Sequence, residues 1–333
     1  MYAQFYGLEK LAFQLTPDPR FFFESPEHRR AMAHLMYGLH NAEGFIIITG
    51  EVGAGKTMLV DCLLSQIDAH SFVVAKIVTS QLEGDDLLRM VASAFGLENT
   101  GLPKAGLLHL IQQFVLAQLA AGRRALLIID EAQNLSFAAL EELRMLSNIV
   151  VGTSPALQSF LLGQPEFRIK IGDPALDQLR QRIVTAYHLA PLNEVDTRGY
   201  IEHRLHCAGW KRDPEFDDDS FAAIYQHTQG VPRQINALCS RLLLFGMLED
   251  THRISAATVE QVASETKAEL SAIQQHGAAN GGGYLAQVNG APNGAALEAI
   301  CERLDRMEIA LGSHDRVIKR MIQIFSKYVQ GGA

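Results

Sequence analysis

The chain has 333 residues, of which 48% are hydrophobic and 20% charged, as expected for a globular protein that buries a sizeable core. Its net charge of −8 argues against a broadly basic nucleic-acid-binding surface. Four scattered cysteines argue against a zinc knuckle or CxxC site and favour reduced thiols. The sequence shows neither a signal-peptide pattern nor an apolar run long enough to span a membrane, so we expect a cytoplasmic protein.

Apolar runs alternate with helical patterns over the first part of the chain. The runs are short, rich in Ile, Val and Leu, and apolar on both faces, at residues 45–49, 72–78, 125–129, 158–162 and 183–188. Amphipathic patterns separate them at residues 59–67, 85–95, 107–120 and 138–147. This alternation is typical of a parallel sheet covered by helices on both faces. We therefore predict an α/β domain over residues 1–190.

The strand pattern stops near residue 191, and helical patterns follow at residues 194–208, 218–228, 232–248 and 256–270. We predict an all-helical second domain over residues 191–270. A stretch rich in Gly, Ala and Asn predicts a flexible linker over residues 271–296. Residues 297–330 then carry apolar side chains at alternating spacings of three and four, which indicates a heptad helix. That helix either packs back on its own domain or associates with a partner or a second copy.

The stretch GFIIITGEVGAGKTML, residues 44–59, places a glycine-rich loop between a predicted strand and a predicted helix. It satisfies the pattern GxxxxGK[ST], in that context, of a phosphate-binding loop. Backbone N–H groups of such a loop and the N-terminus of the helix cradle phosphate oxygens. Lys56 is expected to reach the β- and γ-phosphates of ATP, and the Thr57 hydroxyl to bind Mg²⁺. The predicted nucleotide-binding residues are Gly50, Glu51, Val52, Gly53, Ala54, Gly55, Lys56, Thr57 and Met58.

A second apolar strand, in ALLIIDEAQNL, delivers Asp130 and Glu131 at its carboxyl end. In an open α/β sheet ligands bind at that edge. Asp130 is expected to hold the magnesium ion. Glu131 is expected to be the base that orients or deprotonates the attacking water, which favours hydrolysis over nucleotide sensing alone.

Four further side chains are candidates for the same chemistry. Gln164 follows a later strand and is expected beside the acid pair, where it holds the water or senses the γ-phosphate; otherwise it is a turn residue. Arg180 and Arg182 precede the last strand, where either could reach the nucleotide of a neighbouring subunit, unless both form surface ion pairs. Arg233, in the first turn of a predicted lid helix, is expected over the γ-phosphate or against a carboxylate.

Together these motifs resemble those of the AAA+ ATPases. The segments ITGEVGAGKT, IIDEAQNL, EELRMLSN, LLGQPEF and GVPRQIN, with the opening residues 1–39, are similar to the ATPases of the general secretion pathway protein A type. Within that branch the resemblance is greatest to the ATPase associated with exosortase/PEP-CTERM exopolysaccharide systems. It implies a P-loop AAA+ core with a helical lid, Mg-ATP hydrolysis, a ring or open homo-oligomer, and an arginine finger from the next subunit. In the N-terminal segment it implies apolar groups near the adenine, for which Tyr6, Phe13 and Phe23 are candidates if they are not core residues.

Three functional hypotheses follow. The first is an ATPase that energises or regulates assembly of a cell-envelope polysaccharide or secretion system, with a protein partner at the C-terminal helix and possible recruitment to the inner membrane. The second is an ATP-dependent DNA-binding regulator of the transposition-ATPase type, for which the available cations form no long stripe: Lys10, Arg20, Arg29, Arg30, Lys211 and Arg212. The third is a switch that binds ATP and rarely hydrolyses it.

Overall fold

The computed structural model describes residues 2–16, 18–41, 44–68, 70–79, 83–152 and 154–280. Residues up to Leu270 form one compact unit, and only the end of one helix is described beyond it. The predicted linker beyond residue 280 and the predicted helix 297–330 lie outside the described residues. Within them, no helix combines the length and apolar character that crossing a bilayer requires.

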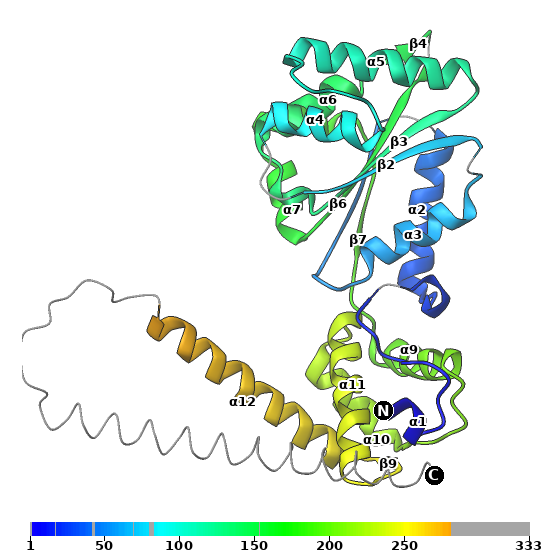
Figure 1. Ribbon diagram of the computed structural model, residues 1–333, viewed down its shortest axis with the longest axis vertical. Coiled ribbons are helices and arrows are strands. Elements are labelled where there is room, and N and C mark those ends of the chain that lie inside the picture. Colours follow the sequence, from blue (N-terminus) through cyan, green and yellow to red (C-terminus); the bar gives the residue numbers. More distant parts are fainter. Residues whose placement is uncertain are drawn as a thin grey trace, which may run out of the picture. The chain divides into compact units, whose positions relative to one another are not determined.

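The centre of the first domain is a five-stranded parallel sheet (Figure 1). Its strands, in spatial order, are β2 (Phe72–Val78), β3 (Arg124–Asp130), β6 (Leu157–Gly163), β1 (Phe45–Gly50) and β7 (Ile183–Leu189). Each matches a run predicted from the sequence, and the predicted parallel α/β core is confirmed. Because β6 pairs with both β1 and β3, the segments that follow these three strands are neighbours at one sheet edge.

Helices cover both faces of this sheet. Strand residues alternate between the faces, as Phe45 and Ile47 of β1 lie in one core cluster and Ile46 and Ile48 in another. One face packs against α4 (Gly84–Ala94), α5 (Lys104–Ala120), α6 (Phe137–Leu146), α7 (Pro165–Ile171) and α8 (Asp177–Arg180). The other packs against α2 (Pro26–Asn41) and α3 (Lys56–Gln66). Short elements between them are the 3₁₀ turns η1 (Pro19–Phe21), η2 (Ala132–Asn134) and η3 (Pro174–Leu176) and the paired strands β4 (Val150–Val151) and β5 (Ser154–Pro155).

The second domain contains α9 (Glu194–Cys207), α10 (Asp218–Thr228), α11 (Pro232–Leu248) and α12 (Ala256–Asn280). Two details differ from the prediction. The domain also holds a two-residue parallel pair, β8 (Glu215–Phe216) with β9 (Arg253–Ile254), too short to leave a pattern in the sequence. In addition, α12 extends ten residues past 270 into the predicted linker, because its alanine and glutamine residues support a helix well.

The N-terminal segment differs more from the expected division of the chain. The sequence places it in the α/β domain, but Tyr6, Phe13 and Phe21 are buried in the same core cluster as residues of α9, α10 and α11. Helix α1 (Tyr2–Phe5) contacts α11, and η1 contacts α9. The segment therefore belongs to the helical lid, because its aromatic side chains pack against apolar side chains of the lid helices.

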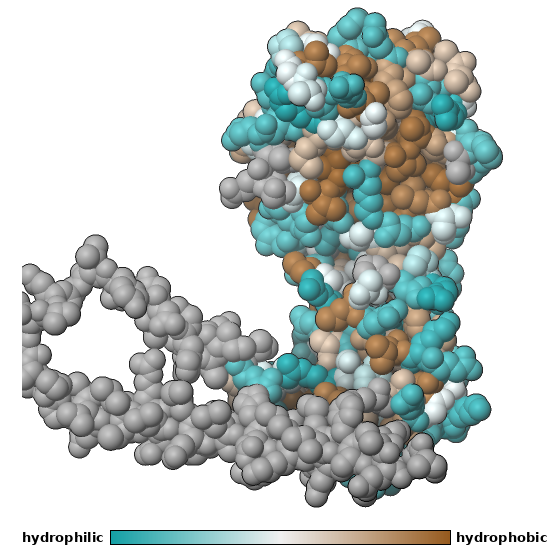
Figure 2. All heavy atoms as spheres, viewed as in Figure 1, coloured by the Kyte–Doolittle hydropathy of each residue, from teal (hydrophilic) through white to brown (hydrophobic). Residues whose placement is uncertain are grey.

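The surface mixes hydrophilic residues with patches of hydrophobic ones, some of which gather over the α/β domain (Figure 2). Met36 and Tyr37 on α2 are among the large apolar side chains that remain exposed. Such a mixture is common on folded proteins.

Gly230 joins the connection before α9 to the start of α11, and its replacement gives a stability test. It adopts φ +69°, its carbonyl accepts from the Leu192 N–H at 3.0 Å, and a Cβ there would overlap the Leu192 carbonyl oxygen. We expect Gly230→Ala to lower the free energy of unfolding by about 3 kcal/mol or more, since the overlap adds to backbone strain. Gly122, at φ +77° with open space around it, is the matched control, and Gly122→Ala should cost only about 1–2 kcal/mol. Equal losses in chemical denaturation would refute the role of the overlap.

Candidate nucleotide site

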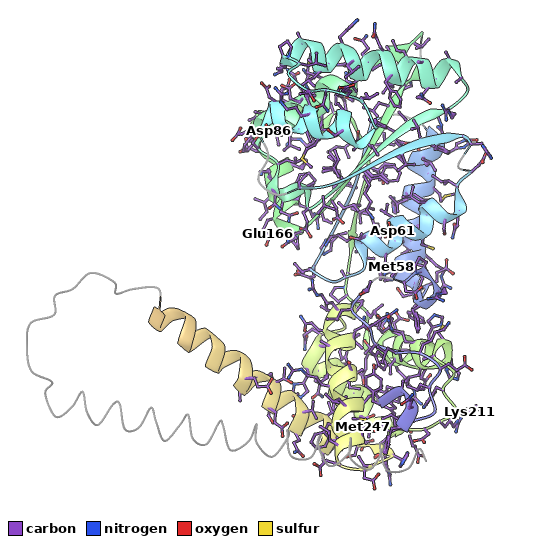
Figure 3. The ribbon with its side chains drawn as sticks, viewed as in Figure 1. Met58, Asp61, Asp86, Glu166, Lys211 and Met247 are labelled. Atoms are coloured by element: carbon purple, nitrogen blue, oxygen red, sulfur yellow. The ribbon has the colours of Figure 1, made fainter. Side chains whose placement is uncertain are left out.

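The loop between β1 and α3 has the backbone of an anion cradle. Gly53 and Gly55 have φ values of +83° and +99°, which glycine adopts without a Cβ penalty. Gly55 caps α3 without a side-chain hydrogen bond, so the first N–H groups of the helix are left to a ligand. Figure 3 labels Met58 and Asp61 on α3 and Glu166 on α7, the two helices that follow β1 and β6 at the ligand-binding edge.

Lys56 lies at the base of this loop and is 6% exposed. Its Nζ donates to the carbonyl oxygens of Gly50 at 2.7 Å and Glu51 at 3.0 Å. Burial lowers the pKa of Lys56, while the carboxylates of Glu131 and Asp130 oppose that shift. A buried ammonium group held by two neutral carbonyls, with no carboxylate in direct contact among the described residues, is suited to an anionic ligand.

Thr57 and Asp130 meet across the gap between α3 and β3. The Thr57 hydroxyl donates to Asp130 Oδ2 at 2.6 Å, and Asp130 Oδ1 accepts from the Glu131 N–H at 2.9 Å. The described residues contain no cluster of three His, Cys, Asp or Glu side chains that could enclose a metal by themselves. Mg²⁺ in nucleotide sites usually takes one or two protein oxygens and completes its shell with phosphate and water. The hydroxyl and carboxylate oxygens here fit that requirement.

Glu131 follows β3, and two glutamine side chains hold its carboxylate. Gln133 Nε2 donates to Glu131 Oε2 at 2.5 Å, and Gln164 Nε2 donates to the same oxygen at 3.1 Å. The strand order explains the meeting, because β6, which ends just before Gln164, lies between β1 and β3. Burial alone raises the pKa of Glu131, but these two hydrogen bonds and the charge of Lys56 outweigh burial, so the net pKa lies below its usual value.

Arg233 lies in the first turn of α11 and faces the loop. Its N–H donates to the Gly53 carbonyl oxygen at 3.2 Å, and a Cβ on Gly53 would overlap the Arg233 side chain. No carboxylate pairs with the Arg233 guanidinium in the part of the chain that the structure describes. The loop and the lid helix therefore touch directly at the place where the sequence predicts a phosphate contact from the lid.

A pocket of about 380 Å³ is lined by Lys56, Thr57, Asp130, Glu131 and Arg233. Loop residues Val52 and Met58 line it, whereas Ala54 is buried beneath the loop and Glu51 is exposed. Its far wall comes from the N-terminal segment and the lid, through Gln14, Leu15, Thr16, Phe21, Phe22, Phe23, Tyr200, Arg204 and Asn236. Of the three aromatic candidates for an adenine contact, Phe23 lines the pocket, while Tyr6 and Phe13 are buried in the lid core.

Arg180 and Arg182 lie away from this pocket. Phe45 N–H, at the start of β1, donates to the Arg182 carbonyl oxygen at 2.9 Å, so both arginines are at the sheet edge opposite the phosphate loop. Arg180 pairs with Asp177 on α8 and donates to the Ile171 carbonyl oxygen. Arg182 donates to Ser147 and Asn148 after α6. Neither arginine can serve the site of its own chain from this position.

Sequence reasoning missed three residues of the site: His28 and Arg204 line the pocket, and Gln133 holds Glu131. Gln133 lies two residues after Glu131 in the sequence. Its contact with the Gln164 N–H depends on tertiary structure. His28, on α2, is buried against Gly55 and contacts the Ser25 hydroxyl at 2.7 Å, and burial lowers its pKa. Arg204, on α9, is 5% exposed and gave no motif signal.

Arg204 connects the lid to the N-terminal segment. Its guanidinium donates to the carbonyl oxygens of Ala12 at 2.7 Å and Gln14 at 3.4 Å and to the Tyr200 hydroxyl at 3.0 Å. It also lies over the Phe21 ring, 4.9 Å from the centroid, a favourable cation–π distance. Through this residue the pocket wall formed by the N-terminal segment is fixed to α9.

Comparison with known proteins agrees with this geometry. A family model described as an AAA domain matches residues 39–171, which run from the end of α2 through α7. General secretion pathway protein A of Aeromonas hydrophila is 38% identical over 268 residues, which cover 80% of this chain. The chain spans about half of that relative, 48% of its length.

Solved structures show the same fold at low sequence identity. The ORC2 protein of Aeropyrum pernix, in its ADPNP and ADP complexes, is 16% identical with a TM-score of 0.59 over 77% of this chain and 72% of that one. Cdc6p from Pyrobaculum aerophilum is 14% identical with a TM-score of 0.58 over 75% and 71% of the two chains. The family model and the Aeromonas relative carry the comparison further than the fold: residues 39–171 match an AAA domain, and over 80% of its length the chain is similar to general secretion pathway protein A.

Proposed function

We propose that the chain hydrolyses Mg-ATP at the pocket between the phosphate loop and the lid. The observation that carries this proposal is the convergence of Lys56, the Thr57–Asp130 pair and Glu131 at one sheet edge. The loop amides and Lys56 bind the phosphates. Thr57 and Asp130 would hold Mg²⁺, which would supply positive charge against the phosphate oxygens.

In this mechanism Glu131 accepts a proton from the attacking water. The water oxygen forms a bond to the γ-phosphorus while the bond from that phosphorus to the bridging oxygen breaks, and ADP leaves with the electron pair. The products are ADP and inorganic phosphate. Gln164 orients the water or senses the γ-phosphate through its bond to Glu131. Arg233, between the lid and the loop, links the nucleotide state to the lid angle.

We also propose that the active form is a homo-oligomer in which Arg182 or Arg180 completes the site of the next subunit. Both lie opposite their own chain's pocket, as a residue serving a neighbour does, and such an arginine raises phosphoryl-transfer rates by about 10³–10⁵ in other systems. Their present partners are neutral groups or one exposed aspartate, which give little resistance to rearrangement.

A mixing experiment tests the arginine in trans. Lys56→Ala subunits, which keep the arginine, are mixed with Arg182→Ala subunits, which keep the phosphate loop, and ATP turnover is measured. We expect each variant to be inactive alone and the mixture to recover turnover. Arg168→Ala, at an exposed position on α7, serves as the control and should be active unmixed. Failure of Arg182→Ala and of Arg180→Ala to be complemented would refute action in trans.

The biological role that we favour is assembly or regulation of a cell-envelope polysaccharide or secretion system. The relative from Aeromonas hydrophila, named for general secretion, supports it, and an exosortase-associated exopolysaccharide system is the specific setting that we propose. The helix predicted at residues 297–330 would dock the protein partner and bring this cytoplasmic ATPase to the inner membrane. A Glu131→Gln allele in the native cell should block export of the envelope product, and truncation at residue 276 should do so with ATP turnover intact. Normal export in both strains would refute the role.

The alternative to this role is ATP-dependent DNA binding. Two of the six available cations are paired with acids in the structure, Arg20 with Asp18 and Arg30 with Glu27. An ATP-dependent shift of duplex DNA, lost at raised salt, would favour the transposition-regulator hypothesis.

A further inference from the structure

Three hydrogen bonds join Glu131, Gln133 and Gln164 in a closed ring. Gln133 Nε2 and Gln164 Nε2 both donate to Glu131 Oε2, at 2.5 Å and 3.1 Å. The backbone N–H of Gln164 in turn donates to Gln133 Oε1 at 3.0 Å. Gln133 thus uses both ends of its side-chain amide, one on the acid and one on the segment after β6. No described residue donates a hydrogen bond to Glu131 Oε1.

The backbone that carries Gln133 is itself held in place. Lys170 on α7 donates to the carbonyl oxygens of Gln133 at 2.8 Å and Leu135 at 2.6 Å. Glu131 adopts φ +56°, unusual for a residue with a side chain, and its carbonyl accepts from the Thr79 hydroxyl at 2.7 Å. The surrounding structure therefore holds Glu131 in a conformation that it would not adopt by preference.

We propose that Gln133 is a positioning residue for ATP hydrolysis, whose amide holds Glu131 Oε2 against Gln164 and so presents Oε1 to the attacking water. This inference rests on the proposed role of Glu131 as the base. In the hydrolytic step Oε1 receives the water proton, while the water oxygen bonds to the γ-phosphorus and ADP departs. Gln133 touches neither water nor nucleotide and acts through the carboxylate.

The electrostatics agree with this geometry. Burial raises the pKa of Glu131, and the hydrogen bonds from Gln133 and Gln164, with the charge of Lys56, bring it below its usual value. Other charged groups on the packed elements are Asp130 on β3 and Lys170 and Glu166 on α7. Removing the Gln133 donor should therefore loosen the hold on Glu131 Oε2, while Gln164 and Lys56 stay in place.

The test replaces Gln133 with methionine, which keeps the length of the side chain and removes its amide. Gln112→Met, at an exposed position on α5, is the matched control. We expect kcat of Gln133→Met to fall about ten- to a hundredfold because the base is misplaced, with KM changed less than about threefold because the phosphate contacts remain. Gln133→Glu, whose ionised carboxylate cannot donate to Glu131, should lower kcat as well, again with KM little changed.

A second measurement does not depend on turnover. The Glu131 carboxyl carbon, labelled with ¹³C and assigned by its loss in Glu131→Gln, is observed by NMR in nucleotide-free protein at one fixed pH. Its chemical shift should move in Gln133→Met, because a hydrogen bond to Oε2 is lost, and stay unchanged in Gln112→Met.

The outcomes separate the two claims. Normal kcat and an unmoved carboxyl chemical shift in folded Gln133→Met would overturn the inference while leaving the hydrolytic function intact. Full turnover in Glu131→Gln would instead overturn the role of the base, on which the inference rests.

Discussion

Glu131→Gln is expected to lower ATP turnover by about 10²–10⁴-fold, because the amide cannot accept the proton of the attacking water. Affinity for Mg-ATP should change little, since Lys56, Thr57 and Asp130 remain in place. Glutamine has nearly the same shape as glutamate. Its amide oxygen can therefore still accept hydrogen bonds from Gln133 and Gln164. Steady-state phosphate release and equilibrium nucleotide binding, measured on the same preparation, give the two quantities.

Glu98→Gln provides the control, at an exposed acid between α4 and α5. It makes the same chemical change away from the pocket and should leave both quantities as they are in the unmodified chain. Turnover by Glu131→Gln equal to that of the unmodified chain would mean that another group activates the water. If the chain is instead a switch that rarely hydrolyses ATP, the ATP turnover of the unmodified chain should itself be low.

Lys56→Ala is expected to weaken Mg-ATP binding at least about a hundredfold, or about 2.8 kcal/mol. The variant removes a buried positive charge from the phosphate cradle and leaves the carbonyl oxygens of Gly50 and Glu51 without their donor. Those two losses act together, because both disturb the backbone that surrounds the phosphates. Titration calorimetry with Mg-ATP measures the change.

Lys211→Ala is the matched control for Lys56→Ala, since Lys211 is an exposed lysine of the lid (Figure 3). Thermal melting without nucleotide shows whether either variant has lost its fold. Unchanged affinity in folded Lys56→Ala would remove Lys56 from the phosphate site.

The sheet and the phosphate loop were predictable because each depends on a short contiguous stretch of sequence. Each strand is a compact apolar run, and the residues from Gly50 to Thr57 satisfy a motif whose backbone conformation depends on glycine. The acid pair was predictable for the same reason, since Asp130 and Glu131 directly follow a buried strand. Their approach to Gln164 follows once the strands are taken as parallel.

The contacts that complete the pocket were not predictable, because they join residues far apart in the chain. The sequence places Tyr6 and Phe13 near the nucleotide or in a core with equal weight, and only the packing of α1 and η1 on the lid assigns them to the core. Arg204 looks like a surface cation of an amphipathic helix until its guanidinium is seen to bind the Ala12 and Gln14 carbonyl oxygens. The role of Gln133 likewise depends on the register that brings β6 beside β3.

The most direct test of the account is a crystal structure of Glu131→Gln grown with Mg-ATP. We predict that the β- and γ-phosphates lie against the loop amides and Lys56. The metal should lie beside Thr57 and Asp130, and the adenine ring near Phe23. Nucleotide density elsewhere on the protein, or a pocket without nucleotide in crystals grown with excess Mg-ATP, would contradict the central claim.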